Sequence, residues 1–199
     1  MKELLSGIQT WSWFSDEKGL NFNGHFITKG DTRLLIDPPP LADADVNALL
    51  VLGVTAIVLT NRDHTRMAGA YRDLFKCPIF APALDATEMK AHIAVDHLYH
   101  DGEILPGEIL VVGIPDGKSP GESALYLGEQ GIFIVGDALI GKPVGSLTML
   151  PPDKFPNYLK AKEGIRRLLD YPFESVLVGD GDPMLTGARM AVEVFLNAG

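Results

Sequence analysis

Side chains that bind metals or transfer protons are concentrated in the segment Thr60–Gly69, "TNRDHTRMAG". It follows the apolar run "VTAIVLT", which is typical of a strand buried on both faces. Asp63 and His64 offer a carboxylate and an imidazole, which serve as metal ligands and as acid–base groups. Asn61 and Arg66 stand beside them, and an arginine cannot bind a metal because it stays protonated. The segment therefore mixes side chains that attract a metal ion with one that repels it.

Three further loops place a polar residue beside glycine or proline after an apolar run. They contain Lys118 in "GKSPGE", Asp137 in "VGDAL" and Asp180 in "VGDGDP". A single Gly-Asp pair is usually a turn or a helix cap. Loops at strand ends are nevertheless the usual place for a functional site on a layered α/β scaffold. Four such loops in one chain favour a shared site.

Strands that could position these loops are predicted from short apolar runs bounded by turn residues. Two strands flank the turn Lys29–Thr32, and the second ends at Asp37, where three prolines stop it. The later strands correspond to "VTAIVLT", "PIFAP", "GEILVVGIP", the hairpin "SALYLGEQGIFIVGD" and "ESVLVGD". Trp11 and Trp13 alternate along a further strand, either as a packed edge or as a pocket rim or dimer contact.

Helices are predicted between these strands. They cover "ADADVNALLVLG", Met67–Phe75, about Leu84–His92, the amphipathic "NYLKAKEGIRRLLD" and the closing "GARMAVEVFLNA". In the first, Asp43 or Asp45 is the expected cap, and the inward residues are Val46, Leu49 and Leu50. The inward residues of the last two are Tyr158, Leu159, Ile165, Leu168, Leu169, Met190, Val194 and Phe195. Strands and helices recur in both halves, which suggests two sheets packed face to face with helices outside.

The order of the motifs resembles the metallo-β-lactamase-fold superfamily over nearly the whole chain. Family members show Thr-His-x-His-x-Asp-His, then Pro-Gly-His-Thr-Pro-Gly, Gly-Asp and Gly-His-Gly. Here Thr60 and Gly69 bracket the first motif, and "KSPGES", "VGDAL" and "VGDGDP" take the places of the others. "LLIDPPP" takes the place of an early Ile-Asp segment. The resemblance implies an α/β (α+β) fold, a four-layer αββα sandwich, as a single domain over residues 1–199, with its site at one edge.

The residues at the family's metal-ligand positions differ from the usual set. Only the bridging aspartate is kept, as Asp137. The other ligand positions fall on Asn61, Asp63, Thr65, Arg66, Lys118 and Asp180. His64 forms an Asp-His pair with Asp63, two positions earlier than in the family.

Charge balance at these positions argues against two zinc ions. Asp63, Asp137 and Asp180 face Arg66 and Lys118, so the negative charges are nearly balanced without a metal. Two fixed cations at 4–6 Å would repel an incoming dication by roughly several kcal/mol in a partly buried pocket. We therefore expect Arg66 and Lys118 to occupy the metal positions and to pair with the aspartates, and we expect no dizinc site.

Three hypotheses follow. In the first, the fold is kept and zinc chemistry is lost, and the pocket binds a small molecule or has a structural role. Its pocket residues would be Asn61, Arg66, Lys142, Ser146 and Asp180. In the second, the protein is a hydrolase of an ester, thioester or phosphoester, with a single divalent ion on Asp63, His64, Asp137 and Asp180. Such an oxygen-rich set suits Mg²⁺, Mn²⁺ or Ca²⁺ better than a zinc pair.

In the third hypothesis catalysis is metal-free, and Lys118 or Asp137 acts as acid or base in a pocket of shifted pKa values. If the protein is an enzyme, we expect its catalytic residues to be Asp63, His64, Lys118 and Asp137.

Composition limits the partners. A formal net charge of -9 disfavours nucleic-acid binding, and one cysteine excludes an intrachain disulfide framework. No apolar run approaches the ~20 residues that a membrane span needs. We expect a cytoplasmic protein with a small-molecule ligand or substrate and no membrane partner. The sequence is compatible with a homo-oligomer.

Overall fold

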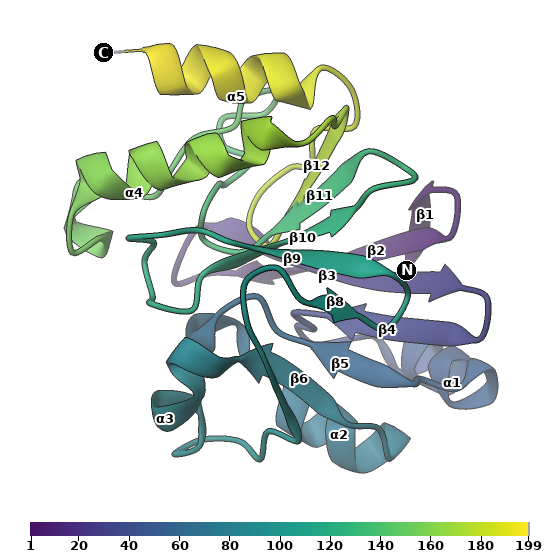
Figure 1. Ribbon diagram of the computed structural model, residues 1–199. Helices are drawn as coiled ribbons and strands as arrows, with labels where there is room; N and C mark the ends of the chain where they lie inside the picture. Colours follow the sequence, from purple (N-terminus) through teal and green to yellow (C-terminus); the bar gives the residue numbers. More distant parts are fainter. Residues whose placement is uncertain (199) are drawn as a thin grey trace.

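The structure is a computed structural model that describes residues 1–198. Two β-sheets lie face to face between two layers of helices (Figure 1). One sheet has seven strands in the order β1-β2-β3-β4-β5-β6-β7, and the other has five in the order β12-β11-β10-β9-β8. This is the four-layer αββα sandwich predicted from the sequence.

The seven-stranded sheet contains the first half of the chain. Its strands are β1 (Lys2–Leu5), β2 (Ile8–Ser15), β3 (Leu20–Lys29), β4 (Thr32–Ile36), β5 (Ala56–Val58), β6 (Ile79–Pro82) and β7 (His97–Tyr99). The five-stranded sheet consists of β8 (Ile104–Leu105), β9 (Ile109–Gly113), β10 (Ser123–Leu127), β11 (Ile132–Val135) and β12 (Ser175–Val178). Neighbours run parallel from β4 to β7 and between β11 and β12, and the other pairs are antiparallel.

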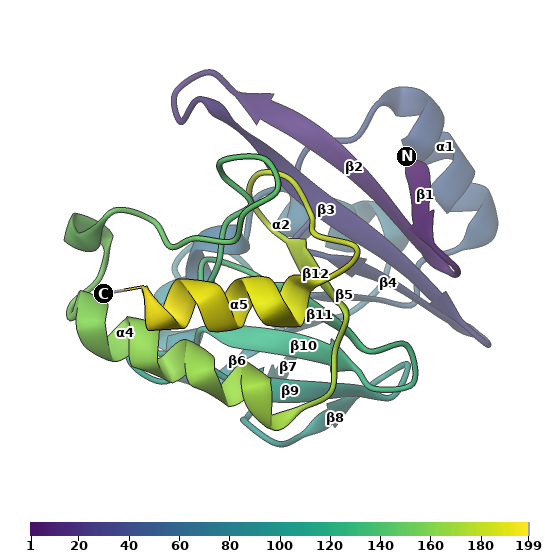
Figure 2. The same ribbon diagram turned by 90° about the horizontal axis from the view of Figure 1, so that it is seen from above.

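Helices α1 (Asp43–Leu52), α2 (Ala68–Phe75) and α3 (Ala86–Met89) cover the seven-stranded sheet, and α4 (Tyr158–Gly164) and α5 (Ala188–Asn197) cover the other (Figures 1 and 2). The 3₁₀ helices are η1 (Arg62–His64), η2 (Ala83–Asp85), η3 (Pro152–Lys154) and η4 (Ile165–Asp170). No helix of residues 1–198 is long and apolar enough to cross a membrane.

Three hydrophobic clusters hold the four layers together. The middle cluster joins the two sheets, for example through Ile27 and Ile134, while each outer cluster joins one sheet to its helices. The alternation along β3 illustrates this, since Phe26 packs toward the helices and Ile27 toward the other sheet. Strands buried on both faces explain why their sequences are continuous apolar runs.

Several details of the predicted helices are wrong. Ala42 takes the N-cap position of α1, and neither Asp43 nor Asp45 caps it with its side chain. The region Leu84–His92 forms only η2 and α3, which end at Met89. The amphipathic segment changes from an α-helix to a 3₁₀ helix at Ile165. Four residues expected to face inward are exposed, namely Leu50, Leu159, Met190 and Val194.

The wrong inward faces have a common cause. In α5 the buried residues are Ala188, Val192 and Leu196, which also have helical spacing but lie on a different face from Met190 and Val194. Both sets of residues are apolar at intervals of four, so periodicity alone cannot choose between them. Ala188 is fully buried in the core cluster between this helix and the sheet.

One residue of β3 fastens the two sheets together at the edge where the loops meet. The Asn23 side-chain amide donates to the carbonyls of Val178 (3.0 Å) and Gly181 (2.7 Å). Its backbone N–H donates to the Gly179 carbonyl at 2.7 Å. These three bonds place the end of β12, and therefore Asp180, beside the loops that follow β4 and β5.

Candidate functional site

The segment singled out in the sequence turns sharply after β5. Asn61 caps η1, and its side-chain oxygen accepts hydrogen bonds from the backbone N–H groups of Asp63 (2.9 Å) and His64 (3.1 Å). This cap turns His64 inward, where it is 3% exposed, while Asp63 faces the surface. The local sequence therefore separates the two neighbours of the Asp-His pair onto opposite sides of the turn.

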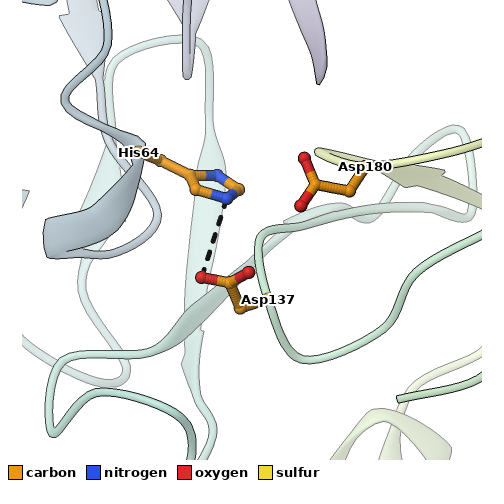
Figure 3. A group of neighbouring side chains, drawn as sticks. All are labelled: His64, Asp137 and Asp180. Carbon is orange, nitrogen blue, oxygen red and sulfur yellow. Dashed lines mark ion pairs between the residues drawn. The ribbon is translucent and has the colours of Figure 1, made fainter. Parts of the chain in front are cut away.

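His64 lies between two carboxylates. Its Nδ1 is 2.8 Å from Asp37 Oδ2, and its Nε2 is 3.7 Å from Asp137 Oδ2, an ion-pair distance longer than a hydrogen bond (Figure 3). Burial and Arg66 oppose protonation, but Asp37 and Asp137 outweigh them and raise the pKa of His64 to about 10. The imidazole is therefore a cation at neutral pH. Gly179 makes room for it, since a Cβ there would lie 2.5 Å from His64 Cε1.

Arg66 occupies the space between the two halves of the chain. Its guanidinium bonds Asp180 Oδ1 at 2.8 Å, the Asn23 carbonyl at 2.8 Å and the Asp37 carbonyl at 3.1 Å. It also lies over the Phe22 ring, 4.6 Å from the centroid. Both Arg66 and Asp37 have positive φ, at 35° and 46°. Such backbone strain costs roughly 1–3 kcal/mol per residue, and these contacts hold it in place.

Lys118 bridges the surface and the interior of the cluster. Its Nζ is 2.9 Å from Asp63 Oδ2 and 2.9 Å from Asp137 Oδ2. Burial opposes its charge, but the two carboxylates raise the pKa of Lys118 above its usual value. Although burial also opposes the charge on Asp137, His64 and Lys118 hold the pKa of Asp137 well below its usual range. Neither group therefore titrates near neutral pH.

A second buried carboxyl lies behind Asp137. Glu122 accepts from Asn61 Nδ2 at 3.0 Å and from the Ala138 backbone N–H at 3.2 Å. The same Asn61 nitrogen lies 3.3 Å from Asp137 Oδ2. Burial and the Asp137 carboxylate raise the pKa of Glu122 well above its usual value.

Another histidine lies on β3 near this cluster. His25 is 1% exposed, and within residues 1–198 neither of its ring nitrogens has a hydrogen-bond partner. Burial dominates over the nearby Asp37 and Val178 carbonyl and lowers the pKa of His25 to about 4. His25 is therefore neutral at physiological pH.

The ligand atoms of His64, Asp137 and Asp180 lie within 4.8 Å of one another (Figure 3). They form the only such group of three among residues 1–198, counting histidine, cysteine and carboxylate side chains. Together these contacts describe a buried, charged site at one edge of the sandwich, built from loops of both sheets.

A family model of the metallo-β-lactamase superfamily matches residues 1–196. The chain belongs to the metallo-β-lactamase superfamily. No curated protein sequence matches the chain.

Solved metallo-β-lactamases share the fold of this superfamily member. A metallo-β-lactamase from Pontibacter korlensis superposes with a TM-score of 0.76 at 16% identity, covering 100% of this chain and 98% of that one. The enzyme FIM-1 from Pseudomonas aeruginosa, in its mono-zinc form, gives 0.73 at 16% identity, covering 98% and 92%. A metallo-β-lactamase family protein from Thermus thermophilus gives 0.71 at 19% identity, covering 96% and 79%. At these identities the likeness shows the fold alone.

The metallo-β-lactamase fold brings most of the predicted site residues together. Asn61, His64, Arg66, Lys118, Asp137 and Asp180 are joined by direct contacts, and Asp63 reaches the group through Lys118. Asp63 is not part of the three-residue group, so the predicted four-ligand set does not converge among the described residues. The Asp63 side chain is 44% exposed.

The hydrogen bonds of Lys142 and Ser146 go to residues outside this cluster. Lys142 Nζ bonds the Gly19 carbonyl at 3.3 Å, and the Ser146 N–H bonds the Pro143 carbonyl at 3.0 Å. Their loop does begin beside the site, because the Gly141 N–H donates to the Asp180 carbonyl at 2.9 Å. Their role as pocket residues stays a prediction.

Three residues with central contacts were not among the predicted site residues, namely Asp37, Thr60 and Glu122. Asp37 accepts from the Thr60 N–H at 2.8 Å and from its hydroxyl at 2.5 Å, in addition to its contact with His64. A signal for Asp37 was present, since it ends an apolar strand as Asp137 and Asp180 do. Glu122 belongs to the loop "GKSPGE", which was singled out for Lys118, but no feature of the sequence distinguished Glu122 itself.

Proposed function

We propose that this protein is a metal-independent member of the metallo-β-lactamase superfamily, in which side-chain cations supply the positive charge of the site. In this proposal the cluster fixes the loops, and the partly exposed pair of Asp63 and Lys118 contacts a small-molecule ligand. The protein would then bind its ligand without hydrolysing it.

One observation carries this proposal. One oxygen of each carboxylate that a metal would need is already paired with a side-chain cation, Asp180 Oδ1 with Arg66 at 2.8 Å and Asp137 Oδ2 with Lys118 at 2.9 Å. The remaining donor, His64, has its Nδ1 against Asp37 and is held protonated by its raised pKa. A protonated imidazole has no lone pair to give to a metal.

The donor set does not fit a zinc pair. Two ions need about four donors each, with nitrogen and sulfur preferred. The converging group of residues 1–198 offers one imidazole and two carboxylates. Around it three cations, His64, Arg66 and Lys118, face four aspartates, so most of the negative charge is compensated by the protein itself.

Metal-free acid–base catalysis by Lys118 or Asp137 is less well supported. An efficient general acid or base has a pKa near the working pH. The pKa of Lys118 is raised and that of Asp137 is lowered, so both are displaced from neutrality in the wrong direction.

A second candidate function is favoured by the convergence of His64, Asp137 and Asp180. These three could hold a single divalent ion, as in a hydrolase of an ester, thioester or phosphoester. Binding would require His64 to lose its proton and both Arg66 and Lys118 to leave their carboxylates. Each of these steps costs free energy, which is why this candidate ranks second.

Metal binding distinguishes the two candidates. Zn²⁺ and Mn²⁺ binding is measured by calorimetry and by elemental analysis after dialysis, for the wild type, Asp137→Ala and Lys118→Met. We expect the wild type to bind no more metal than Asp137→Ala. Lys118→Met removes the cation paired with Asp137, so this variant should bind the metal ion more tightly than the wild type. Lys154→Met is the matched control, because Lys154 pairs with Asp153 at the exposed surface. One ion per wild-type chain that is lost in Asp137→Ala would favour the second candidate, and two zinc ions would contradict both.

A further inference from the structure

The proposed function makes Lys118 a fixed cation, although a lysine side chain is long and flexible. Its two carboxylate partners come from different segments, Asp63 from η1 and Asp137 from the loop after β11. Lys118 itself lies in the loop between β9 and β10 and is 24% exposed. A contact between η1 and this loop close to Lys118 would help to keep Lys118 opposite Asp63.

Asp85 makes that contact. It lies at the end of η2, is 1% exposed, and belongs to no part of the ion-pair cluster. Its Oδ2 accepts from the Arg62 N–H at 2.9 Å and from the Ser119 hydroxyl at 2.6 Å, and its Oδ1 accepts from the Gly121 N–H at 3.0 Å. One buried carboxylate thus receives hydrogen bonds from both segments.

The positions of these donors are informative. Arg62 directly precedes Asp63, and Ser119 directly follows Lys118. The two halves of the Lys118–Asp63 ion pair are therefore each one residue away from an Asp85 contact. Gly121 permits the approach, since a Cβ there would lie 2.6 Å from Asp85 Cγ and 2.7 Å from Pro82 Cβ. The close approach explains why position 121 is a glycine. The motif Pro-Gly-His-Thr-Pro-Gly of the resembled family also ends in a glycine at this place.

We propose that Asp85 is a positioning residue that holds Lys118 between Asp63 and Asp137 by tying the Lys118 loop to η1. The inference rests on the proposed function, in which Lys118 is a stand-in cation. Hydrogen bonds to an ionised carboxylate are stronger than neutral ones, so neutralising Asp85 should loosen the Lys118 loop more than removing one donor does.

Acylation of individual lysines, followed by mass spectrometry, tests this in the full chain without any metal. The variants are Asp85→Asn and the milder Ser119→Ala, which keeps the other two bonds. The rate at Lys118 is divided by the rate at the exposed Lys160 in the same sample. Loss of one charge-assisted hydrogen bond should raise the relative rate about tenfold in Asp85→Asn, with a smaller rise in Ser119→Ala.

Asp101→Asn is the matched control. Asp101 also accepts from a backbone N–H, that of Gly113, and from a side chain, that of Arg167, but both of these partners lie outside the Lys118 loop. If Asp85 only stabilises the fold, Asp85→Asn should lower the melting temperature. The acylation rate at Lys118 should then stay equal to that in the wild type and in Asp101→Asn.

The outcomes separate the two proposals. Slow acylation of wild-type Lys118 with faster acylation in both variants supports the role of Asp85. Slow acylation in the wild type and in both variants overturns that role and leaves the proposed function standing. Fast wild-type acylation, equal to that of Lys160, removes the fixed cation and overturns both. Should Asp85→Asn fail to fold, Ser119→Ala decides the result.

Discussion

Two buried histidines in neighbouring regions of this protein have opposite charge states. His64 is 3% exposed and lies between Asp37 and Asp137, with its pKa raised to about 10. His25 is 1% exposed on β3, without a hydrogen-bond partner among residues 1–198, and its pKa is lowered to about 4. Burial opposes the charge in both places. Burial is therefore not what distinguishes the two imidazoles. The carboxylates in contact with His64 decide that it is protonated, whereas His25 is not.

The sharpest test of this comparison is the same substitution at both positions. His64→Leu leaves Asp37 and Asp137 buried without their shared cation, and removing one partner of a buried pair costs about 3–5 kcal/mol of unfolding free energy. Urea unfolding at neutral pH measures the loss, with His25→Leu as the matched control. Equal losses for the two variants would contradict the role assigned to the partners.

The pH dependence of the His64 contribution follows from the raised pKa. Because the folded pKa lies above 6.5, the stabilisation is fully present below pH 6.5 and is lost as the pH rises through about 10. The difference in unfolding free energy between the wild type and His64→Leu should therefore shrink between pH 6.5 and about 10. A difference that stays constant over this range would mean that His64 is not charged in the folded protein.

Arg66 extends the charged region, and its geometry should matter as well as its charge. Arg66→Lys keeps the charge but cannot reproduce the bonds to Asp180, Asn23 and Asp37 or the contact with Phe22. We expect a loss of about 2 kcal/mol in urea unfolding, roughly one hydrogen bond to a charged group. Arg72→Lys, at the partly exposed pair with Asp96, should cost less than about 1 kcal/mol. Equal costs would show that Arg66 acts only as a point charge.

The smallest effect is expected at the uncharged histidine. His25→Leu removes a buried polar ring without partners, so stability at neutral pH should stay level or rise by about 1 kcal/mol. Because the folded pKa of His25 lies below 6.5, the wild type should lose stability as the pH falls from 6.5 toward 4, and the variant should lack this term. Parallel pH profiles for the two proteins would indicate a partner for His25 that stabilises its charged form.

The sequence contained enough information to predict the fold and most of the charged cluster. Motif order and buried strand patterns predicted the αββα sandwich, and the charges of Arg66 and Lys118 predicted their pairing with Asp63, Asp137 and Asp180. The direction of the Asp-His pair was not readable, because it depends on the Asn61 cap, which turns His64 inward and Asp63 outward. A cap of this kind depends on the backbone angles of one residue.

Residues that act through another residue were harder to recognise. Asp85 lies in a short 3₁₀ turn, and its importance comes from donors that are far away in sequence, such as Ser119 and Gly121. Helix faces were also ambiguous in α5, where two apolar sets with the same spacing compete. In both cases the deciding information is tertiary, so no local pattern could contain it.

The bonds between Asn23 and the chain at Val178–Gly181 have a consequence for biosynthesis. The site needs β3, made early in translation, and the end of β12, made late. While the chain is still growing, Arg66 and His64 have been made but Asp180 has not. Arg66 therefore lacks its carboxylate partner until the segment after β12 has been made.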